Sequence, residues 1–244
     1  MNHFRLAIFG GSSFIGRRLC QHLISILQLA TYKNHSFKNG IYFDAISSDA
    51  GLLISTHKIS HAIIAFAEPD VDKCKRHLEE SYNINVLGVK RVIDACVRCN
   101  VKIIFLSSEY VFDGLKGQYS ETDSPNPTTV YGSQKNQIEL YLNKVAPNLH
   151  TTLRLSKVYG IGNTDKSILQ HWASQIVNNN KILCACDQLF TPVNISFVCD
   201  VILRVLQYDI TGLYHLSGNT HVSRFDMFNI LYKCSIRLEI TCFD

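Results

Sequence analysis

Tyr131 and Lys135 form the residue pair in this chain whose types and spacing are best suited to chemistry. Four residues along a helix make just over one turn, so the phenol and the ammonium would project from the same helical face. A tyrosine has an ordinary pKa near 10, and a neighbouring positive charge lowers that pKa because it favours the phenolate. The pair could therefore exchange a proton with a substrate oxygen near neutral pH. Spacing alone leaves a surface pair without a role as the alternative, since chance supplies roughly 0.6 such pairs in this composition.

A serine at the end of a predicted strand supports the catalytic interpretation. The apolar run 102–106 ends in Ser107 and Ser108, which precede Tyr131 in the chain. Ligands of an open parallel sheet bind at the carboxyl ends of its strands. Ser108, Tyr131 and Lys135 in this order predict a reductive site. The serine would bind a carbonyl oxygen beside the phenol, and the lysine would also hold the nicotinamide ribose.

A glycine-rich turn follows the apolar run 6–9 and leads into a helical pattern. Backbone N–H groups in such a turn, together with the helix N-terminus, attract phosphate oxygens. Ser13 stands where the GxxGxxG pattern of extended short-chain dehydrogenases has its middle glycine, and its hydroxyl could donate to a phosphate. A purely structural turn is the alternative. The residues expected to bind a dinucleotide here are Gly10, Ser12, Ser13, Phe14, Ile15 and Gly16.

The residues after the second predicted strand indicate which dinucleotide binds. An acidic residue there favours NAD, whereas a basic one accommodates the 2′-phosphate of NADP. The segment 31–35 contains Lys33 and no acid, so NADP(H) is favoured over NAD(H), with Lys33 as the phosphate contact. Asp44 could hydrogen-bond the adenine amine. The alternatives are an exposed loop lysine and an aspartate that caps a turn.

The order of predicted elements indicates an α/β fold. Continuous apolar strands that alternate with helices are typical of a parallel sheet covered on both faces. We therefore expect a Rossmann-like doubly wound sheet over 1–160, with the catalytic helix, and a mixed segment over 161–244 that contributes a small, reduced substrate lobe to one continuous unit. Strands are expected at 6–9, 29–32, 41–43, 61–66, 102–106, 152–155 and near Ile182. Helices are expected at 15–26, 71–98, 129–145, 167–177 and 198–206.

Composition excludes several classes of protein. With 46% hydrophobic and 18% charged residues the chain is not disordered. The net charge of +4 is scattered, which argues against nucleic-acid binding. No apolar run is long enough for a membrane span. The nine cysteines lack zinc-ribbon spacing, so no metal site is expected, and their odd number favours the reducing cytoplasm.

Three sequence blocks resemble a known family. Residues 107–114 (SSEYVFDG), 119–127 (YSETDSPNP) and 130–135 (VYGSQK) are similar to the motifs of dTDP-4-dehydrorhamnose reductases, extended short-chain dehydrogenases of the sugar-nucleotide-binding family. The resemblance implies NADP(H)-dependent reduction of a 4-keto-6-deoxy nucleotide sugar for polysaccharide synthesis. Tyr131 would be the proton donor, Lys135 its partner, and Ser108 the active-site hydroxyl. Ala65 and Ala67 would line the cofactor. The residues implied to flank substrate or nicotinamide are Glu109, Tyr110, Val111 and Phe112.

Two other functions stay open at this point. The chain could be a nucleotide-sugar epimerase or dehydratase, although Tyr110 follows Glu109 where a dehydratase has a second acid. It could also be a non-catalytic NADP-binding regulatory subunit like that of methionine adenosyltransferase, which keeps the same motifs. The expected partner is a nucleotide-linked sugar, with neither nucleic acid nor membrane, and a homodimer is a candidate assembly. The chain ends earlier than the family pattern, which is why a reduced substrate lobe is expected.

Overall fold

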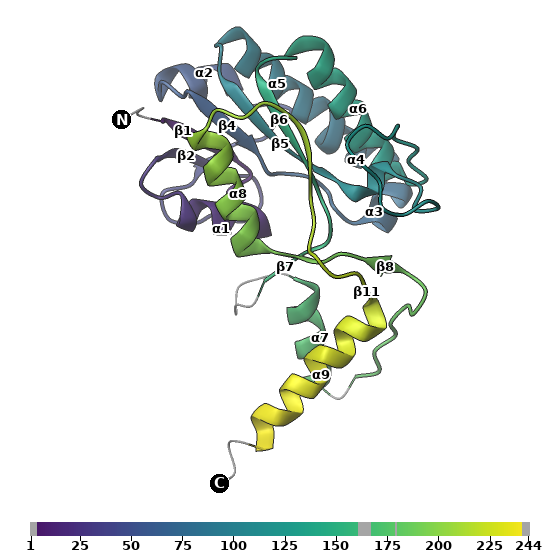
Figure 1. Cartoon of the computed structure of the whole chain (residues 1–244). Helices are drawn as coiled ribbons and strands as arrows, with labels where there is room; N and C mark the ends of the chain where they lie inside the picture. The colour runs from purple at the N-terminus through teal and green to yellow at the C-terminus, as the bar shows by residue number, and fades with distance from the viewer. Residues whose placement is uncertain (1–3, 161–166, 179, 241–244) are drawn as a thin grey trace. The chain divides into compact units, whose positions relative to one another are not determined.

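The computed structural model describes residues 4–160, 167–178 and 180–240, with side chains described up to Lys233. The chain forms two compact units. The first consists of Met1–Leu155 and Cys199–His215, and the second of Ser156–Val198 and Leu216–Asp244. Figure 1 shows the course of the chain through both units. The sequence-predicted site residues all belong to the first unit.

A parallel sheet forms the centre of the first unit. Within the described residues its seven strands have the order β10-β6-β5-β4-β1-β2-β3, and strands β1 to β6 pair in parallel. The strand order reverses between β1 and β4, which is where a doubly wound sheet opens its ligand crevice. This arrangement confirms the predicted Rossmann-like fold. The strands are β1 (Leu6–Phe9), β2 (Leu27–Tyr32), β3 (Ile41–Tyr42), β4 (His61–Ile64), β5 (Lys102–Ser108), β6 (His150–Leu155) and β10 (Gly212–Leu216).

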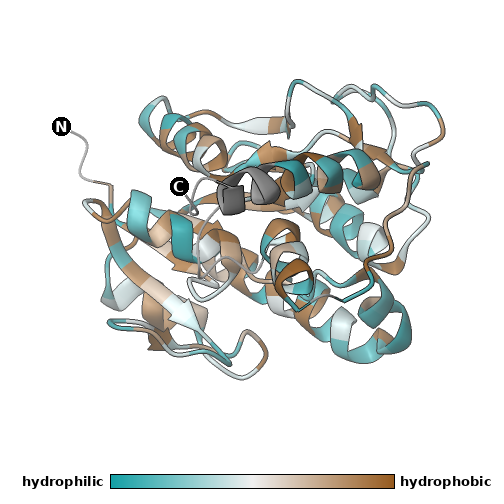
Figure 2. Ribbon diagram, turned by 90° about the horizontal axis from the view of Figure 1, so that it is seen from below, coloured by the Kyte–Doolittle hydropathy of each residue, from teal (hydrophilic) through white to brown (hydrophobic). Residues whose placement is uncertain are grey.

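Helices cover both faces of this sheet. Figure 1 shows α1 (Phe14–His22) and α8 (Ile195–Gln207) on one face, and α2 (Ala50–Thr56), α5 (Val89–Arg98) and α6 (Val130–Val145) on the other. The helices α3 (Val71–Arg76) and α4 (Leu78–Tyr82) follow β4. Hydrophobic and hydrophilic residues alternate along the helices (Figure 2), as expected for elements with one buried face.

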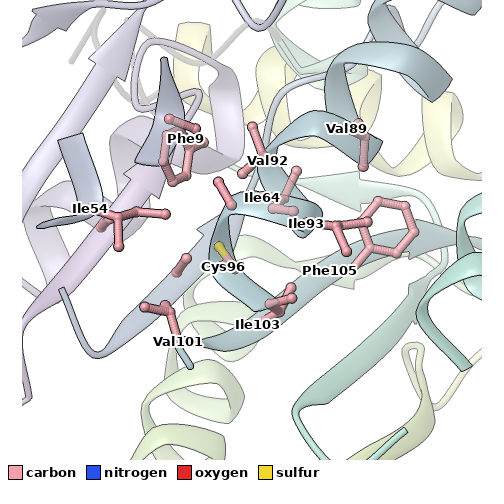
Figure 3. Packing of buried hydrophobic residues seen from close by; sticks show 14 of the residues in the cluster. Phe9, Ile54, Ile64, Val89, Val92, Ile93, Cys96, Val101, Ile103 and Phe105 are labelled. Carbon is pink, nitrogen blue, oxygen red and sulfur yellow. The ribbon is translucent and has the colours of Figure 1, made fainter. Parts of the chain in front are cut away.

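The main core lies between the sheet and the second group of helices. Phe9, Ile64 and Phe105 point from β1, β4 and β5 toward Val92 and other α5 side chains, and each of these four residues is at most 1% exposed (Figure 3). Strand residues of the other parity, such as the buried Ile8, lie on the opposite face of the sheet because successive side chains alternate across a sheet. This packing fixes the strand ends that carry the candidate site.

The segment 71–98 differs from the single helix that the sequence predicts. The helical backbone breaks at His77 (φ −123°, ψ 66°) between α3 and α4, and a π-helix, η1 (Asn83–Gly88), precedes α5. Ser81 Oγ donates to the carbonyl oxygens of Cys74 and Leu78, which gives backbone groups at the break a partner. The spacing of apolar residues does not reveal this break, because apolar residues recur at helical spacing both before and after His77.

Two smaller predictions about elements are also wrong, and one helix was not predicted. Helix α1 ends at His22 rather than near Ile26, because Leu23 caps it and β2 already begins at Leu27. No strand forms at Ile182, where the described backbone is irregular. The sequence did not predict α2, which Asp49 starts by accepting a hydrogen bond from the Leu52 N–H.

The described part of the second unit includes four short strands and the helices α7 and α9. Strand β7 (Val158–Tyr159) pairs in parallel with β9 (Val193–Asn194), and β8 (Leu189–Phe190) pairs antiparallel with β11 (Val222–Ser223). Helices α7 (Ile168–Val177) and α9 (Arg224–Ile240) meet through the rings of Trp172 and Phe228, whose centroids are 5.7 Å apart. Among the described residues of both units, no helix is long and apolar enough to cross a membrane.

Candidate active site

Tyr131 and Lys135 lie in the first two turns of α6. Thr129 caps the helix, its Oγ1 accepting the N–H of Gly132 at 3.0 Å. The Tyr131 side chain and the Lys135 side chain share a face, with Lys135 Nζ 5.6 Å from the centroid of the tyrosine ring. Both residues are buried, 9% and 5% exposed. The structure thus brings the predicted pair together and removes it from bulk water.

The ammonium of Lys135 is held against β5. Its Nζ donates to the carbonyl oxygen of Leu106 at 2.8 Å and lies 4.7 Å from the centroid of the Phe105 ring. Burial lowers the pKa of Lys135 to about 8, while the charge of Glu139 acts in the opposite direction. Leu106 lies two residues before Ser108 on β5. This contact therefore fixes the lysine next to the strand end that carries the Ser108 hydroxyl.

The pKa of Tyr131 differs from the sequence-based expectation. Burial raises the pKa of the phenol above its usual value, with smaller contributions in the same direction from Cys74 and Tyr110. A hydrogen bond with the Ser108 side chain acts in the opposite direction. Spacing along a helix indicated the positive neighbour but not the loss of water around the ring. The phenol therefore keeps its proton at neutral pH.

Ser108 ends β5 and starts a short 3₁₀ helix, η2 (Glu109–Val111). Its Oγ accepts the N–H of Tyr110 at 3.3 Å, and the Tyr110 ring meets the Tyr131 ring edge to face at 5.9 Å. The start of α6 packs directly against η2 at Gly132. A Cβ atom on Gly132 would lie only 1.9 Å from the carbonyl oxygen of Tyr110, so this contact requires glycine. Ser108, Tyr110 and Tyr131 thus form one cluster.

The four residues implied to flank the substrate do not share one environment. Glu109 and Tyr110 are partly exposed at the site. Val111 is fully buried. The ring of Phe112 stacks on Tyr119 with centroids 4.2 Å apart, and its other contacts include the guanidinium of Arg154 at 4.9 Å from the ring centroid. Val111 and Phe112 therefore pack within the first unit, whereas Glu109 and Tyr110 are partly exposed.

The glycine turn, where a phosphate site is predicted, is closely packed. Gly10 has φ +95°, and a Cβ atom there would lie 2.6 Å from the N atom of Phe66. A Cβ atom on Gly16 would lie 2.1 Å from the carbonyl oxygen of Gly10. Ser13 adopts extended dihedral angles and caps α1 by accepting the Gly16 N–H at 3.0 Å. The first turn of α1 contains no acidic residue, so nothing opposes an anion at this helix N-terminus.

The predicted adenosine contacts lie at the ends of neighbouring strands. Lys33 follows β2 and Asp44 follows β3, and the two side chains form an ion pair with Nζ and Oδ2 2.9 Å apart. Hydrogen bonds from the Ile46 N–H and from Lys33 lower the pKa of Asp44. Nearly half of the Lys33 side chain is exposed, so it can reach a ligand while Asp44 holds it.

A buried polar cluster that the sequence reasoning missed supports the loop after β4. Ala65 and Ala67 are partly buried in this loop. Asn85, from η1, accepts the Glu68 N–H at 2.8 Å and donates to the Glu68 carbonyl at 3.1 Å. Its amide also donates to Gln134 on α6 at 2.7 Å. An asparagine among apolar residues of a predicted helix is the signal that could have indicated it.

A second missed feature is the ion pair of Glu139 on α6 with Arg154 on β6. Arg154 Nη2 lies 2.7 Å from Glu139 Oε2, and both side chains are almost completely buried. An arginine in the middle of an apolar strand run was the available signal, because a buried charge requires a partner. Within the part of the chain that the structure describes, no group of three or more His, Cys, Asp or Glu residues could hold a metal ion.

Comparison with known proteins identifies relatives over nearly the whole chain. The sequence profile of the family described as the RmlD substrate binding domain matches residues 4–237. The dTDP-4-dehydrorhamnose reductase of Aggregatibacter actinomycetemcomitans is 30% identical over 237 residues, which cover 91% of this chain and 76% of the relative. The methionine adenosyltransferase 2 subunit beta of Bos taurus is 26% identical over 193 residues, covering 72% of this chain and 57% of the relative.

Solved structures share the fold. A hypothetical dTDP-4-dehydrorhamnose reductase from Sulfolobus tokodaii superposes with a TM-score of 0.83 at 25% identity, covering 94% of this chain and 82% of that chain. A dTDP-4-dehydrorhamnose reductase from Bacillus anthracis in complex with NADP gives 0.81 at 20% identity, with coverages of 95% and 80%. MoeE5 in complex with UDP-glucose and NAD gives 0.84 at 22% identity, with coverages of 94% and 81%.

Proposed function

The chain belongs to the family described as the RmlD substrate binding domain, its relatives include a dTDP-4-dehydrorhamnose reductase, and we propose that it reduces the 4-keto group of a nucleotide-linked 6-deoxysugar with NADP(H). One observation carries this proposal: Tyr131 and Lys135 are buried side by side next to Ser108, at the carboxyl end of a central parallel strand. Ligands of doubly wound sheets bind at that edge.

The protein side chains divide the work of reduction. Reduced nicotinamide, when bound, supplies the hydride that carbon 4 of the sugar receives. The phenol of Tyr131, which burial keeps protonated, donates its proton to the ketone oxygen as that oxygen gains negative charge. The Lys135 ammonium then stabilises the phenolate that forms, and the phenolate regains a proton from solvent. Ser108 donates a hydrogen bond to the same oxygen and so orients the ketone.

The glycine turn and the strand ends fit a dinucleotide. The backbone of Gly10 and Gly16 is too closely packed for side chains, so a phosphate could approach the turn closely, where the N–H groups of Phe14 and Ile15 at the α1 N-terminus would bind it. Ser12, Ser13, Phe14 and Ile15 would complete this cradle. Ala65 and Ala67 would lie against the nicotinamide half, in the loop that Asn85 fixes.

We propose NADP(H) rather than NAD(H) because of the residues after β2. Lys33 would pair with the 2′-phosphate, and Asp44 would hold the lysine in place and accept from the adenine amine. The solved relatives with bound NADP and with bound NAD have the same fold, so fold alone does not discriminate between the cofactors. Lys33→Ala should weaken NADPH binding by at least tenfold and leave NADH binding within twofold, as measured by fluorescence titration. Equal losses for both cofactors would contradict this assignment.

Turnover with defined sugars tests the reaction. Purified protein should oxidise NADPH in the presence of dTDP- or UDP-linked 4-keto-6-deoxysugars, and product analysis should show reduction at carbon 4. Tyr131→Phe should lose at least a hundredfold in kcat. Tyr141→Phe is the matched control, because this tyrosine lies on the same helix but bonds Asp94. Undiminished turnover in Tyr131→Phe would reject Tyr131 as the proton donor.

A regulatory function is the second candidate. The similarity to methionine adenosyltransferase 2 subunit beta favours it. Tight NADPH binding without oxidation by any 4-keto nucleotide sugar would support this function over the reductase.

An epimerase would instead interconvert sugar stereoisomers with no net consumption of cofactor. The cytoplasm is the proposed site of the reaction because the seven cysteines whose side chains the structure describes are free thiols, and a homodimer stays a prediction.

A further inference from the structure

Glu139 lies one helical turn beyond Lys135 on α6, and four hydrogen bonds fix its carboxylate. Arg154 Nη2 donates to Oε2 at 2.7 Å, and Arg154 Nε donates to both carboxylate oxygens at 3.1 Å. The Ser107 hydroxyl donates to Oε1. Arg154 Nη1 in turn contacts Nε2 of His215 at 3.2 Å, which restrains the guanidinium. The carboxylate is therefore held in one position, paired with the Arg154 guanidinium.

This ion pair is buried, with the glutamate and arginine side chains only 3% and 4% exposed. Removing two charges from water costs free energy, and apolar residues of similar volume often stabilise a fold at least as well. The pair is thus not explained by fold stability alone. Its position suggests what else it does, because the carboxylate stands between the strand that carries Ser108 and the helix that carries Lys135.

The surroundings of the Lys135 ammonium contain little negative charge. From β5 it meets the Leu106 carbonyl and the Phe105 ring, and from α6 the Tyr131 ring, while the Cys74 thiol of α3 acts on it electrostatically. Burial raises the pKa of Cys74, so this thiol is neutral. Tyr131 also keeps its proton. Among the groups described around Lys135, Glu139 is the one that carries a full negative charge.

We propose that Glu139 is a positioning residue, whose carboxylate, fixed by Arg154 and Ser107, keeps the Lys135 side chain as an ammonium beside Tyr131. A buried lysine without a countercharge would release its proton and lose its effect on the phenolate. The inference deepens the proposed function and rests on it for the role of Lys135, but not for the charge state of that side chain. Glu139 itself need not touch substrate or cofactor.

Direct titration of the lysine tests this proposal without using turnover. The full chain is labelled with ε-¹³C-lysine and titrated by NMR, and the Lys135 signal is identified by its loss in Lys135→Arg. Glu139→Gln keeps the shape and removes the charge, so the Lys135 midpoint should fall by about one pH unit or more. Glu139→Asp, the matched control, keeps the charge and should shift the midpoint by less than half as much.

The opposite outcome distinguishes a purely structural role. If Glu139 only holds helix and strand together, its loss would admit water, and the Lys135 midpoint would stay unchanged or rise toward the ordinary value of a lysine. Either result overturns the proposal. Where Glu139→Gln does not fold because Arg154 is left unpaired, the double variant Glu139→Gln/Arg154→Met removes both charges. Because Arg154 pairs directly with Glu139 and offsets part of its charge, the fall expected in the double variant is smaller than in Glu139→Gln, and a midpoint that does not fall overturns the proposal.

Turnover of the wild-type protein separates this inference from the proposed function. A lowered Lys135 midpoint in Glu139→Gln, with a wild type that reduces no 4-keto nucleotide sugar, supports the role of Glu139 and rejects the reductase. An active reductase whose Lys135 midpoint does not respond to Glu139→Gln rejects the positioning role and leaves the reductase in place.

Discussion

Replacing Gly132 with alanine should displace Tyr131, because the start of α6 touches the Tyr110 carbonyl at this residue. The new Cβ atom would lie 1.9 Å from that oxygen, whereas Cβ atoms in proteins essentially never come closer than 3.0 Å to a heavy atom that is not bonded to them. The two backbone segments must therefore separate by about 1 Å. Both segments carry site residues, so the phenol moves relative to Ser108.

The expected effects on stability and on turnover differ in size. Overpacking of this kind costs about 1–3 kcal/mol in the free energy of unfolding, partly offset by about 1 kcal/mol from the better helix propensity of alanine. A displacement of about 1 Å at a reacting group can reduce kcat by about a hundredfold. Gly132→Ala should thus remain folded but lose most of its turnover. The assays are NADPH oxidation at saturating substrate and the midpoint of urea unfolding by circular dichroism.

Gly51→Ala is the matched control, in the first turn of α2. Its Cβ atom would have Asp49 Oδ1 at 3.2 Å and Arg98 at 3.9 Å as its nearest neighbours, and no backbone atom closer. This variant should gain a few tenths of a kcal/mol up to about 1 kcal/mol and keep wild-type turnover. Turnover of Gly132→Ala within twofold of the wild type would show that the contact with Tyr110 does not position Tyr131.

Three further predictions concern pH, helix capping and the core. Burial lowers the pKa of Lys135 to about 8, so the ammonium is present below that pH and kcat/KM should fall as the pH rises through it. A pH–rate profile checks this, and Lys135→Arg should remove the fall up to pH ~10. Ser13→Ala should lower stability by about 1 kcal/mol and Ser13→Gly by a few tenths, whereas equal losses in urea unfolding would contradict the cap at α1. Ile93→Ala, at a fully buried position, should cost about 2–5 kcal/mol. Ile24→Ala, 70% exposed, should stay within about 0.5 kcal/mol in the same measurement.

Local patterns predicted those parts of the fold that local physics determines. The strand at Leu6–Phe9, the glycine turn and the start of α1 were readable because a short buried strand is a continuous apolar run and the turn residues follow it directly. The first turns of α6 were readable for a similar reason, since a helix fixes which residues share a face. The break at His77 was not, because Ser81, which bonds the Cys74 carbonyl across it, also accepts a hydrogen bond from Gln134 on α6, far away in the sequence.

Features of the site that depend on contacts through space escaped the sequence. The ion pair of Lys33 with Asp44 requires the register of β2 beside β3, which neither segment encodes alone. Glu139 and Arg154 meet because α6 packs on the sheet next to β6. The raised pKa of Tyr131 reflects how completely the surrounding elements exclude water. Residue types and spacing suggested the participants, and packing decided their charge states.

The return of the chain to the first unit at Cys199 has a consequence for biosynthesis. Strand β10 lies at the edge of the sheet beside β6, yet residues 156–198, which separate Leu155 from Cys199, belong to the other unit. While the ribosome is still translating that intervening stretch, β6 has one side without its neighbour. An open edge of this kind is a template for pairing with other chains. We therefore expect nascent or truncated forms that stop before β10 to aggregate, and we expect the edge to close only after the last residues of that strand emerge.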